Sequence, residues 1–238
     1  MRTLARVSRR KTESLPVGDS AAVRRMKRYL PFVIIVVVLA ATVAAGVALY
    51  RKHLPKPVPT VGDPGAEPPH ARGDERAPVL LEEFGDFECP PCGKLAPEIE
   101  TLAKSYGRKL RLVFREYPLI MHKHAAAAAR AAEAAGLQGH FWEMHHLLYE
   151  TQAAWSAAVD PQAIFENDAT KIGLDLPRFK TDMNSEVVKS RIIADQARAT
   201  SLHVESTPSV FVNNQVVKAG PGVADRLRTA IDAALTKK

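Results

Sequence analysis

A strand, a helix and a second strand follow one another between Val79 and Leu119, and this pattern limits the fold more than any other feature. Apolar residues cluster in "PVLLEEFGDF", return at helical spacing in "PPCGKLAPEIETLAKSYG", and alternate with charged residues in "KLRLVFREYPL". A helix of this length between two strands predicts a crossover that joins parallel strands. The sequence therefore predicts an α/β fold.

A helical block and a closing ββα unit complete the expected order of elements. The alanine-rich stretch that ends at Gly136 and the amphipathic "HFWEMHHLLYETQ" both favour helices. "PSVFVNNQVVKAG" predicts a hairpin that turns at Asn213-Asn214, and "GVADRLRTAIDAALTKK" predicts a last amphipathic helix.

An apolar run without a charged residue, "LPFVIIVVVLAATVAAGVAL", precedes these elements. It is long enough to cross a hydrocarbon core, which takes ~20 helical residues, and Tyr29 and Tyr50 flank it. We expect an anchor helix over residues 30–50. The alternative is a cleaved signal peptide with Gly46-Val47-Ala48 as its cleavage site, but the apolar part of such peptides is usually ~7–15 residues.

The formal net charge of +7 comes from the N-terminus. Residues 1–28 hold nine basic and two acidic side chains, so the remaining chain is balanced. This distribution argues against a nucleic-acid partner and favours a cytoplasmic segment over residues 1–29. The rest of the chain should then lie outside the cytoplasm, in an oxidising space.

Residues 51–77 are predicted to form a linker. Six prolines in this segment disfavour helix and sheet, and apolar residues show no periodicity. The folded domain is therefore expected over residues 78–238.

The only two cysteines lie in "FECPPCGK", after the first predicted strand and at the start of the helix. A helix N-terminus carries unpaired N–H groups and a partial positive charge, which stabilise a thiolate. The pKa of Cys89 should therefore lie below that of a free thiol. Cys92, one turn further on, can attack a mixed disulfide formed at Cys89, so the spacing favours a redox centre.

The two cysteines allow two other interpretations. A zinc site needs about four ligands, and no second cysteine pair is present, although His122 and His124 are conceivable partners and thiolates also favour Cu(I). A structural disulfide across so short a loop would add little stability. We expect no metal at the site, and we expect His122 and His124 at the surface.

Three motifs in this order, "FGDFECPPC", "HFWEMHHLLYE" and "STPSVFVNN", resemble the DsbA-like thiol–disulfide oxidoreductases, in particular their membrane-anchored bacterial members. The resemblance runs from about Pro78 to the C-terminus. It implies a thioredoxin-like fold with a helical insertion at about residues 122–203. It also implies that Cys89 attacks, that Cys92 resolves, and that a redox-active Cys89–Cys92 disulfide serves in place of a bound cofactor.

The resemblance assigns further site residues. The Thr207–Pro208 bond is the candidate cis bond facing the cysteines, and the backbone of Thr207 can pair with an extended substrate. Ser206 and Phe87 are further candidate substrate contacts.

A buried carboxylate often lies beneath the disulfide in this family, and Glu83 is the best match, with Glu82 next. Such a carboxylate accepts a proton from the second cysteine. Because neighbouring strand residues point to opposite faces, at most one of the two should point inward, and the other should face water.

The prolines of the motif bear on the redox potential. Strongly oxidising family members carry a histidine directly before the second cysteine, whereas this chain has Pro91, preceded by Pro90. Proline neither donates a hydrogen bond nor carries charge. We expect a pair that is less oxidising than the strongest oxidases, which lie near ~−120 mV.

The function expected from all of this is the oxidation of cysteine pairs in exported proteins. The resemblance implies a single-pass protein of the bacterial inner membrane with its catalytic domain in the periplasm, and a quinone-linked membrane partner, DsbB- or VKOR-like, that reoxidises it. We expect a monomer. A reductase or isomerase of the same fold, and a tethered chaperone that binds copper or zinc, are the alternatives.

Overall fold

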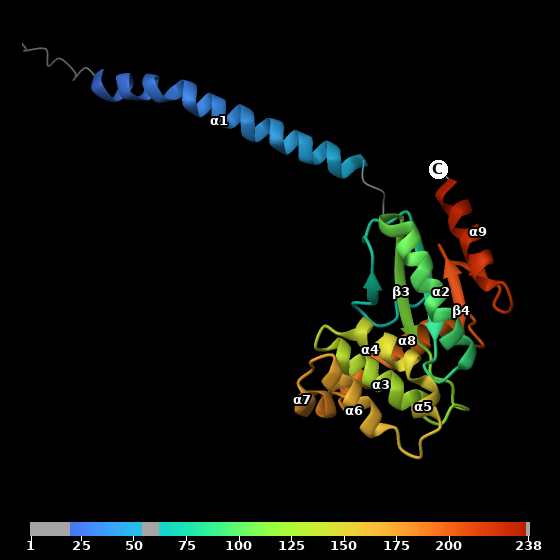
Figure 1. Ribbon diagram of the computed structural model, residues 1–238. Coiled ribbons are helices and arrows are strands. Elements are labelled where there is room, and N and C mark those ends of the chain that lie inside the picture. Colours follow the sequence, from blue (N-terminus) through green and yellow to red (C-terminus); the bar gives the residue numbers. More distant parts are fainter. Residues whose placement is uncertain (1–19, 54–61, 237–238) are drawn as a thin grey trace, which may run out of the picture. The chain divides into compact units, whose positions relative to one another are not determined.

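The structure, a computed structural model, describes residues 20–53 and 62–236 (Figure 1). The chain divides into two compact units, one within residues 1–54 and one within residues 55–238.

The first unit contains the helix α1, Ser20–His53. Its segment Tyr29–Tyr50 has a mean hydropathy of 2.9 and no buried residue, so by length and composition it could cross a membrane. Pro31 lies inside the helix, and not in its first turn as the start of the apolar run would suggest. The reason is that good helix formers such as Ala21 and Ala22 precede it, and the helix begins at Ser20.

The second unit is built on a five-stranded sheet with the order β1-β3-β2-β4-β5. The pair β2 and β3 is parallel, and the helix α2 and a short 3₁₀ helix, η1, connect its strands. The other neighbouring pairs are antiparallel, so the predicted βαβ and hairpin units are confirmed. The bounds are β1 His70–Arg72, β2 Val79–Gly85, α2 Pro90–Tyr106, η1 Gly107–Lys109, β3 Leu110–Glu116, β4 Ser209–Val212 and β5 Gln215–Val217.

Helices fill the chain between β3 and β4. They are α3 Ala125–Gly136, α4 Phe141–Glu150, α5 Gln152–Ser156, α6 Gln162–Lys171, α7 Leu176–Asp182 and α8 Glu186–Ser201. Seven of the nine alanines of α3 are buried, which lets α4 and α8 pack closely against it. Large apolar side chains such as Trp155, Phe165 and Phe179 complete this core.

Both faces of the sheet are covered. On one face, α2 packs against α9 (Val223–Thr236), as Figure 1 shows, and Leu81, Leu112 and Leu227 share their core. On the other face, Phe84 packs against Ala199 of α8. Every residue of β2 is therefore buried, as in sheets that helices cover on both sides.

The turn of the predicted hairpin lies at Asn213 and Asn214, whose φ angles are +46° and +63°. Asparagine tolerates this left-handed region, and two such residues form the tight turn that suits the twist of a hairpin. The Asn213 side chain also accepts a hydrogen bond from the backbone N–H of Leu80 at 2.7 Å, which fastens the turn to β2.

The predicted linker, residues 51–77, is wrong over residues 51–53, which belong to the helix α1, and over residues 62–77, which belong to the folded domain. Arg115 donates to the carbonyl oxygens of Pro64 and Ala66, at 3.0 and 2.8 Å, and Arg198 donates to that of Asp63 at 2.6 Å. These partners lie far along the chain, so no local pattern reveals the contact. The part of the prediction at residues 54–61 lies outside the described residues.

Glu82 corrects a second prediction, because it does not face water. It is 3% exposed and points to the face that α8 covers, where Arg115 Nε lies 2.8 Å from Oε1 and Arg198 Nη2 lies 2.6 Å from Oε2. The two arginines hold the pKa of Glu82 below its usual value, although burial opposes them. Both glutamates are buried because both faces of the sheet are covered.

We predict that Glu82→Ala lowers the free energy of unfolding by about 3–5 kcal/mol, because it removes the carboxylate that pairs with the buried guanidinium groups of Arg115 and Arg198. Urea unfolding measures this change. A matched control is Lys189→Ala, which breaks the exposed pair of Lys189 with Glu186 on α8 and should cost under about 1 kcal/mol. Equal, small effects of the two variants would contradict the account.

Candidate redox site

Cys89 stands at the junction between a strand and a helix. After β2 ends at Gly85, the chain turns, and the N–H of Cys89 donates to the carbonyl oxygen of Asp86 at 3.1 Å. Cys89 is the N-cap residue of α2, with φ −73° and ψ 117°, and its carbonyl oxygen accepts from the N–H of Gly93 at 3.1 Å. The thiol is thereby placed at the positive end of the helix dipole.

Pro90 and Pro91 are the first two residues of α2. Proline fits this position because the first N–H groups of a helix have no partner within the helix. The two prolines also remove donors, since an N-cap side chain accepts from the second or third helical N–H. Of the first three residues of α2, only Cys92 carries a backbone N–H that can stabilise a Cys89 thiolate.

The two cysteines are free thiols with different environments. Cys89 is 4% exposed and Cys92 is 0% exposed. The pKa of Cys89 is lowered to about 6, first by the hydrogen bond with the Cys92 thiol and then by the side chain of Thr207 and the backbone of Cys92. Burial raises the pKa of Cys92 far above its usual value, and its hydrogen bond with Cys89 adds to this. Cys89 is therefore the more readily ionised thiol of the pair.

Thr207 and Pro208 face the cysteines from the start of β4. The Thr207–Pro208 peptide bond is cis, as the sequence predicts. The Cys89 thiol donates to the carbonyl oxygen of Thr207 at 3.4 Å. Ser206, one residue earlier, is exposed. This segment therefore presents backbone groups beside the reactive sulfur.

Glu83 lies within the sheet on the side of the cysteines. It is 2% exposed, its Oε1 atom has no hydrogen-bond partner, and its register neighbours are the apolar Phe114 and Val210. Burial, and after it the charge of Cys89, raises the pKa of Glu83 to about 8. The charge of Glu83 in turn raises the pKa of Cys92. The carboxyl group and the cysteines therefore influence one another's ionisation.

Phe87 does not contact a substrate in the way the resemblance suggests. It is 1% exposed, and its ring packs against those of Phe114 and Tyr149 at centroid distances of 5.2 and 5.0 Å. The cysteine loop turns this side chain inward, into the aromatic core that also holds His145. Phe87 anchors the loop.

Gln152 of α5 is a site residue that the sequence does not reveal. Its Nε2 atom donates to the carbonyl oxygens of Phe87 at 2.6 Å and Cys89 at 3.0 Å. Its Oε1 atom lies only 2.8 Å from where a Cβ on Gly93 would stand. The helical block thereby fastens the cysteine loop, and Gly93 leaves the room for it.

His122 and His124 are not simple surface groups, in contrast to the prediction. His122 Nδ1 lies 2.7 Å from Asp86 Oδ2, and the N–H of His124 donates to Glu88 Oε2 at 2.5 Å. Their loop lies against the cysteine loop because the ends of the parallel strands β2 and β3 are neighbours. Within the described residues, no three or more His, Cys, Asp or Glu side chains come together in a group that could hold a metal ion.

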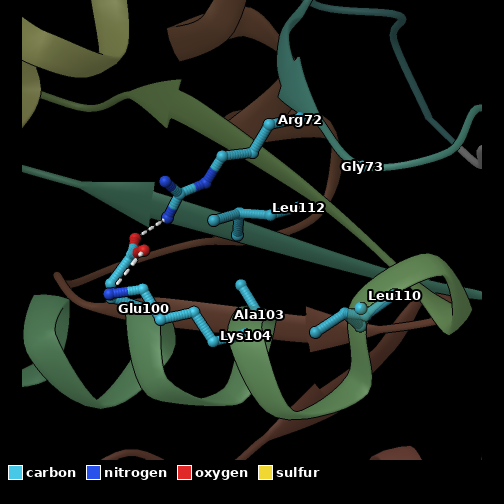
Figure 2. Close-up of a pocket in the computed structure, with 8 residues that line it drawn as sticks. Arg72, Gly73, Glu100, Ala103, Lys104, Leu110 and Leu112 are labelled. Carbon is cyan, nitrogen blue, oxygen red and sulfur yellow. Dashed lines mark hydrogen bonds and ion pairs between the residues drawn. The ribbon is translucent and has the colours of Figure 1, made fainter.

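A pocket of about 260 Å³ lies between α2 and the β1–β3 edge of the sheet (Figure 2). Arg72 and Glu100 form an ion pair across it, and Leu110 and Leu112 belong to its apolar lining. The pocket opens at the C-terminal half of α2, whereas Cys89 caps the other end of that helix. It is therefore separate from the cysteines.

Glu83 generates a pH-dependent prediction. Its folded pKa of about 8 is above its ordinary 4.5, so the folded state binds an extra proton between these values. This contribution to stability is present below pH ~4.5 and falls as the pH rises to 8, by at most about 1.4 kcal/mol per pH unit. Glutamine does not titrate, so the free energy of unfolding of Glu83→Gln has no such decrease with pH. The stability of this variant relative to the natural protein should therefore increase from pH 5 to 8.

Urea unfolding at several pH values checks this prediction. Glu98→Gln, an exposed site on α2, is the control and should show a difference from the natural protein that does not change with pH. A pH-independent difference for Glu83→Gln would show that the carboxyl group is not held protonated.

Comparisons with known proteins agree with this geometry. A family model described as thioredoxin matches residues 66–233. A thioredoxin-like oxidoreductase from Silicibacter pomeroyi DSS-3 is 28% identical with a TM-score of 0.62, over 74% of this chain and 95% of that one. DsbA2 of Pseudomonas aeruginosa is 26% identical with a TM-score of 0.55, over 71% and 94% of the two chains. The oxidised BdbD of Bacillus subtilis, at 24% identity and a TM-score of 0.63, covers 73% of this chain and 96% of that one and supports the fold.

Curated relatives match over a smaller part of their length. A protein named Na(+)/H(+) antiporter NhaA 1, from Mycolicibacterium vanbaalenii, is 37% identical over 169 residues, which are 69% of this chain and 26% of that protein. This chain spans about a quarter of the length of such relatives, so the likeness concerns that quarter alone. The family-model match over residues 66–233 shows that the chain belongs to the thioredoxin family. Together with the cysteine pair at the start of α2, the solved structures above show that it has the fold of the DsbA-type thiol–disulfide oxidoreductases.

Proposed function

We propose that the protein oxidises cysteine pairs in exported proteins, outside the cytoplasm, by thiol–disulfide exchange. The observation that carries the proposal is the asymmetry of the pair. The pKa of Cys89, at the N-terminus of α2, is lowered to about 6, while that of the fully buried Cys92 is raised. One cysteine is thereby suited to attack and to leave, and the other to resolve.

The exchange takes place in two steps. A substrate thiolate attacks the Cys89 sulfur of the oxidised pair, the Cys89–Cys92 bond breaks, and Cys92 leaves with the electron pair and takes up a proton. A second substrate thiolate then attacks the substrate sulfur of the mixed disulfide and releases Cys89 as a thiolate. The substrate has lost two electrons, and the enzyme pair has gained them.

Glu83 supplies the proton in the first step. Its pKa of about 8 means that it is mostly protonated at neutral pH, and burial next to the pair leaves water little access. In the reverse direction the same carboxylate accepts the proton of Cys92. A group with a pKa near the working pH is suited to both roles.

The substrate lies along the segment that ends at the cis bond. Thr207 places its backbone beside Cys89, and Ser206 is exposed next to it. An extended chain that pairs with this backbone would bring its cysteine to the reactive sulfur. The main-chain nature of this contact suits an enzyme that acts on many sequences.

The helix α1 and the charge distribution support the proposed location. The apolar segment Tyr29–Tyr50 would anchor the protein in the bacterial inner membrane, with residues 1–29 in the cytoplasm and the thioredoxin-like domain in the periplasm. A quinone-linked membrane protein, DsbB- or VKOR-like, would accept the two electrons and restore the disulfide. The protein would act as a monomer.

Trapping is the first test of this function. In Cys92→Ala the Cys89 thiolate can still attack a disulfide of a partner, which is the reverse of the exchange above, but no second cysteine is left to release the partner. Full-length protein in a bacterial host should therefore accumulate disulfide-linked partners through Cys89, seen on non-reducing gels. The double variant with Cys89→Ala as well is the control and should trap none. If Cys92→Ala also traps no partner, the proposed function is wrong. Labelling of the free thiols of Cys89 and Cys92 in the natural protein, in the same cells, shows the direction of the exchange. In an oxidase the two cysteines form a disulfide at steady state, whereas in a reductase or isomerase they are free thiols.

The prolines generate a prediction about the potential. With one backbone donor lost at Pro91 and no imidazole in its place, the reduced pair gains less from a Cys89 thiolate. We expect the natural protein to titrate against glutathione below ~−120 mV, and Pro91→His to raise its potential by about 30 mV, a tenfold change in the equilibrium constant. A natural potential at or above ~−120 mV contradicts this explanation, and Pro97→His, inside α2, is a control that should change little.

A further inference from the structure

Asp86 is a buried carboxylate that the exchange chemistry does not use. It is 1% exposed and lies three residues before Cys89, whose N–H donates to the Asp86 carbonyl oxygen. Its Oδ1 atom accepts from the N–H of Glu88 at 2.7 Å, and its Oδ2 atom accepts from the N–H of Leu119 at 2.8 Å and from His122 Nδ1 at 2.7 Å. The carboxylate is therefore held beside the cysteine loop in one position.

At this position the charge of Asp86 disfavours the thiolate form of Cys89. The negative charge of Asp86 raises the pKa of Cys89, against the groups that lower it. In a site with little water such a charge acts strongly on its neighbours. A cation next to Asp86 would cancel much of the effect, and His122 is the cation that the structure provides.

His122 is held by its own loop. The segment of residues 117–124 follows β3 and is tied to the cysteine loop by backbone groups at both ends. The N–H of Tyr117 donates to the carbonyl oxygen of Gly85 at 2.9 Å, and that of His124 donates to Glu88 Oε2. The imidazole is 23% exposed, so it can exchange protons with solvent while it stays on Asp86.

We propose that His122 is a positioning residue for the thiol–disulfide exchange, which fixes the Asp86 carboxylate and offsets its charge and so favours the Cys89 thiolate. The inference rests on the proposed function and deepens it. The cation that Pro91 cannot supply from within the motif comes instead from a loop far along the chain.

The charged neighbours of the imidazole agree with this role. Asp86, Cys89 and Glu88 all favour its protonated form, and together they raise the pKa of His122 although burial works against them. His122 is therefore still charged where Cys89, with its pKa of about 6, titrates. The pair of His122 and Asp86 is then close to neutral when the thiolate forms.

The test compares variants of the full-length protein in detergent. His122→Asn keeps a donor near the place of Nδ1 but removes the charge. We expect it to raise the pKa of Cys89, read from thiolate absorbance at 240 nm, so that the ratio of thiolate to thiol at pH 6 falls about tenfold. The equilibrium constant for oxidation of glutathione by the disulfide should fall by a similar factor, which is about 30 mV. His122→Lys restores a cation and should recover most of both values.

Two further variants separate the proposed mechanism from others. His146→Asn removes a surface histidine that pairs with Glu150 on α4 and should change neither value. Asp86→Asn should lower the pKa of Cys89, and in that background His122→Asn should change the thiolate ratio by less than about twofold. The proposal is overturned if His122→Asn leaves the thiolate ratio of Cys89 nearly unchanged in the natural protein. It is also overturned if His122→Asn changes this ratio as much in the Asp86→Asn background as in the natural protein.

These measurements do not depend on finding a substrate. If the trapping experiment fails but the His122 variants shift the pKa of Cys89 as described, the proposed function is wrong and the coupling is right. If trapping succeeds and the His122 variants do not shift the pKa of Cys89, the proposed function is supported and the coupling is wrong.

Discussion

The contact between the two cysteines at the first turn of α2 is the interaction on which the site depends. It lowers the pKa of Cys89 and raises that of Cys92, so one pair of identical groups acquires two roles. The contact requires the helix to start where β2 has just ended, and it requires α2 to be held on the sheet by buried residues such as Leu95 and Leu102. Gln152 then fixes the loop from the helical block. The fold thus serves mainly to hold two sulfur atoms and the backbone of Thr207 together.

Burial of the sheet on both faces explains the rest of the electrostatics. On the face of the cysteines, Glu83 has no cation among its register neighbours, so its pKa rises to about 8 and it can exchange a proton with Cys92. On the other face, Glu82 is held ionised by Arg115 and Arg198, which also bind the chain that enters the domain. The pKa values of two adjacent residues of the same type are therefore shifted in opposite directions, because the groups that surround them differ.

Much of this could be predicted from the sequence because it is encoded locally. The strand before Cys89, the helix after it and the hairpin turn at Asn213 each depend on residues close together in the chain, and the structure has them where expected. What could not be predicted depends on distant partners. The segment of residues 62–77 folds because arginines more than 40 residues away bind its carbonyl oxygens. The burial of Phe87 and the contact of His122 with Asp86 likewise arise from the packing of β3 and its following loop against β2. No local pattern records these contacts.

The low pKa of Cys89 underlies the proposed exchange, and the pH dependence of alkylation tests it most directly. Reduced full-length protein is treated with iodoacetamide between pH 4 and 10, and each cysteine is followed by mass spectrometry. The rate at Cys89 should reach half of its maximum near pH 6, while Cys92 reacts only at far higher pH. If the alkylation rates of both cysteines instead increase together near pH 8.5, the pKa of an ordinary thiol, the proposed difference between Cys89 and Cys92 is contradicted.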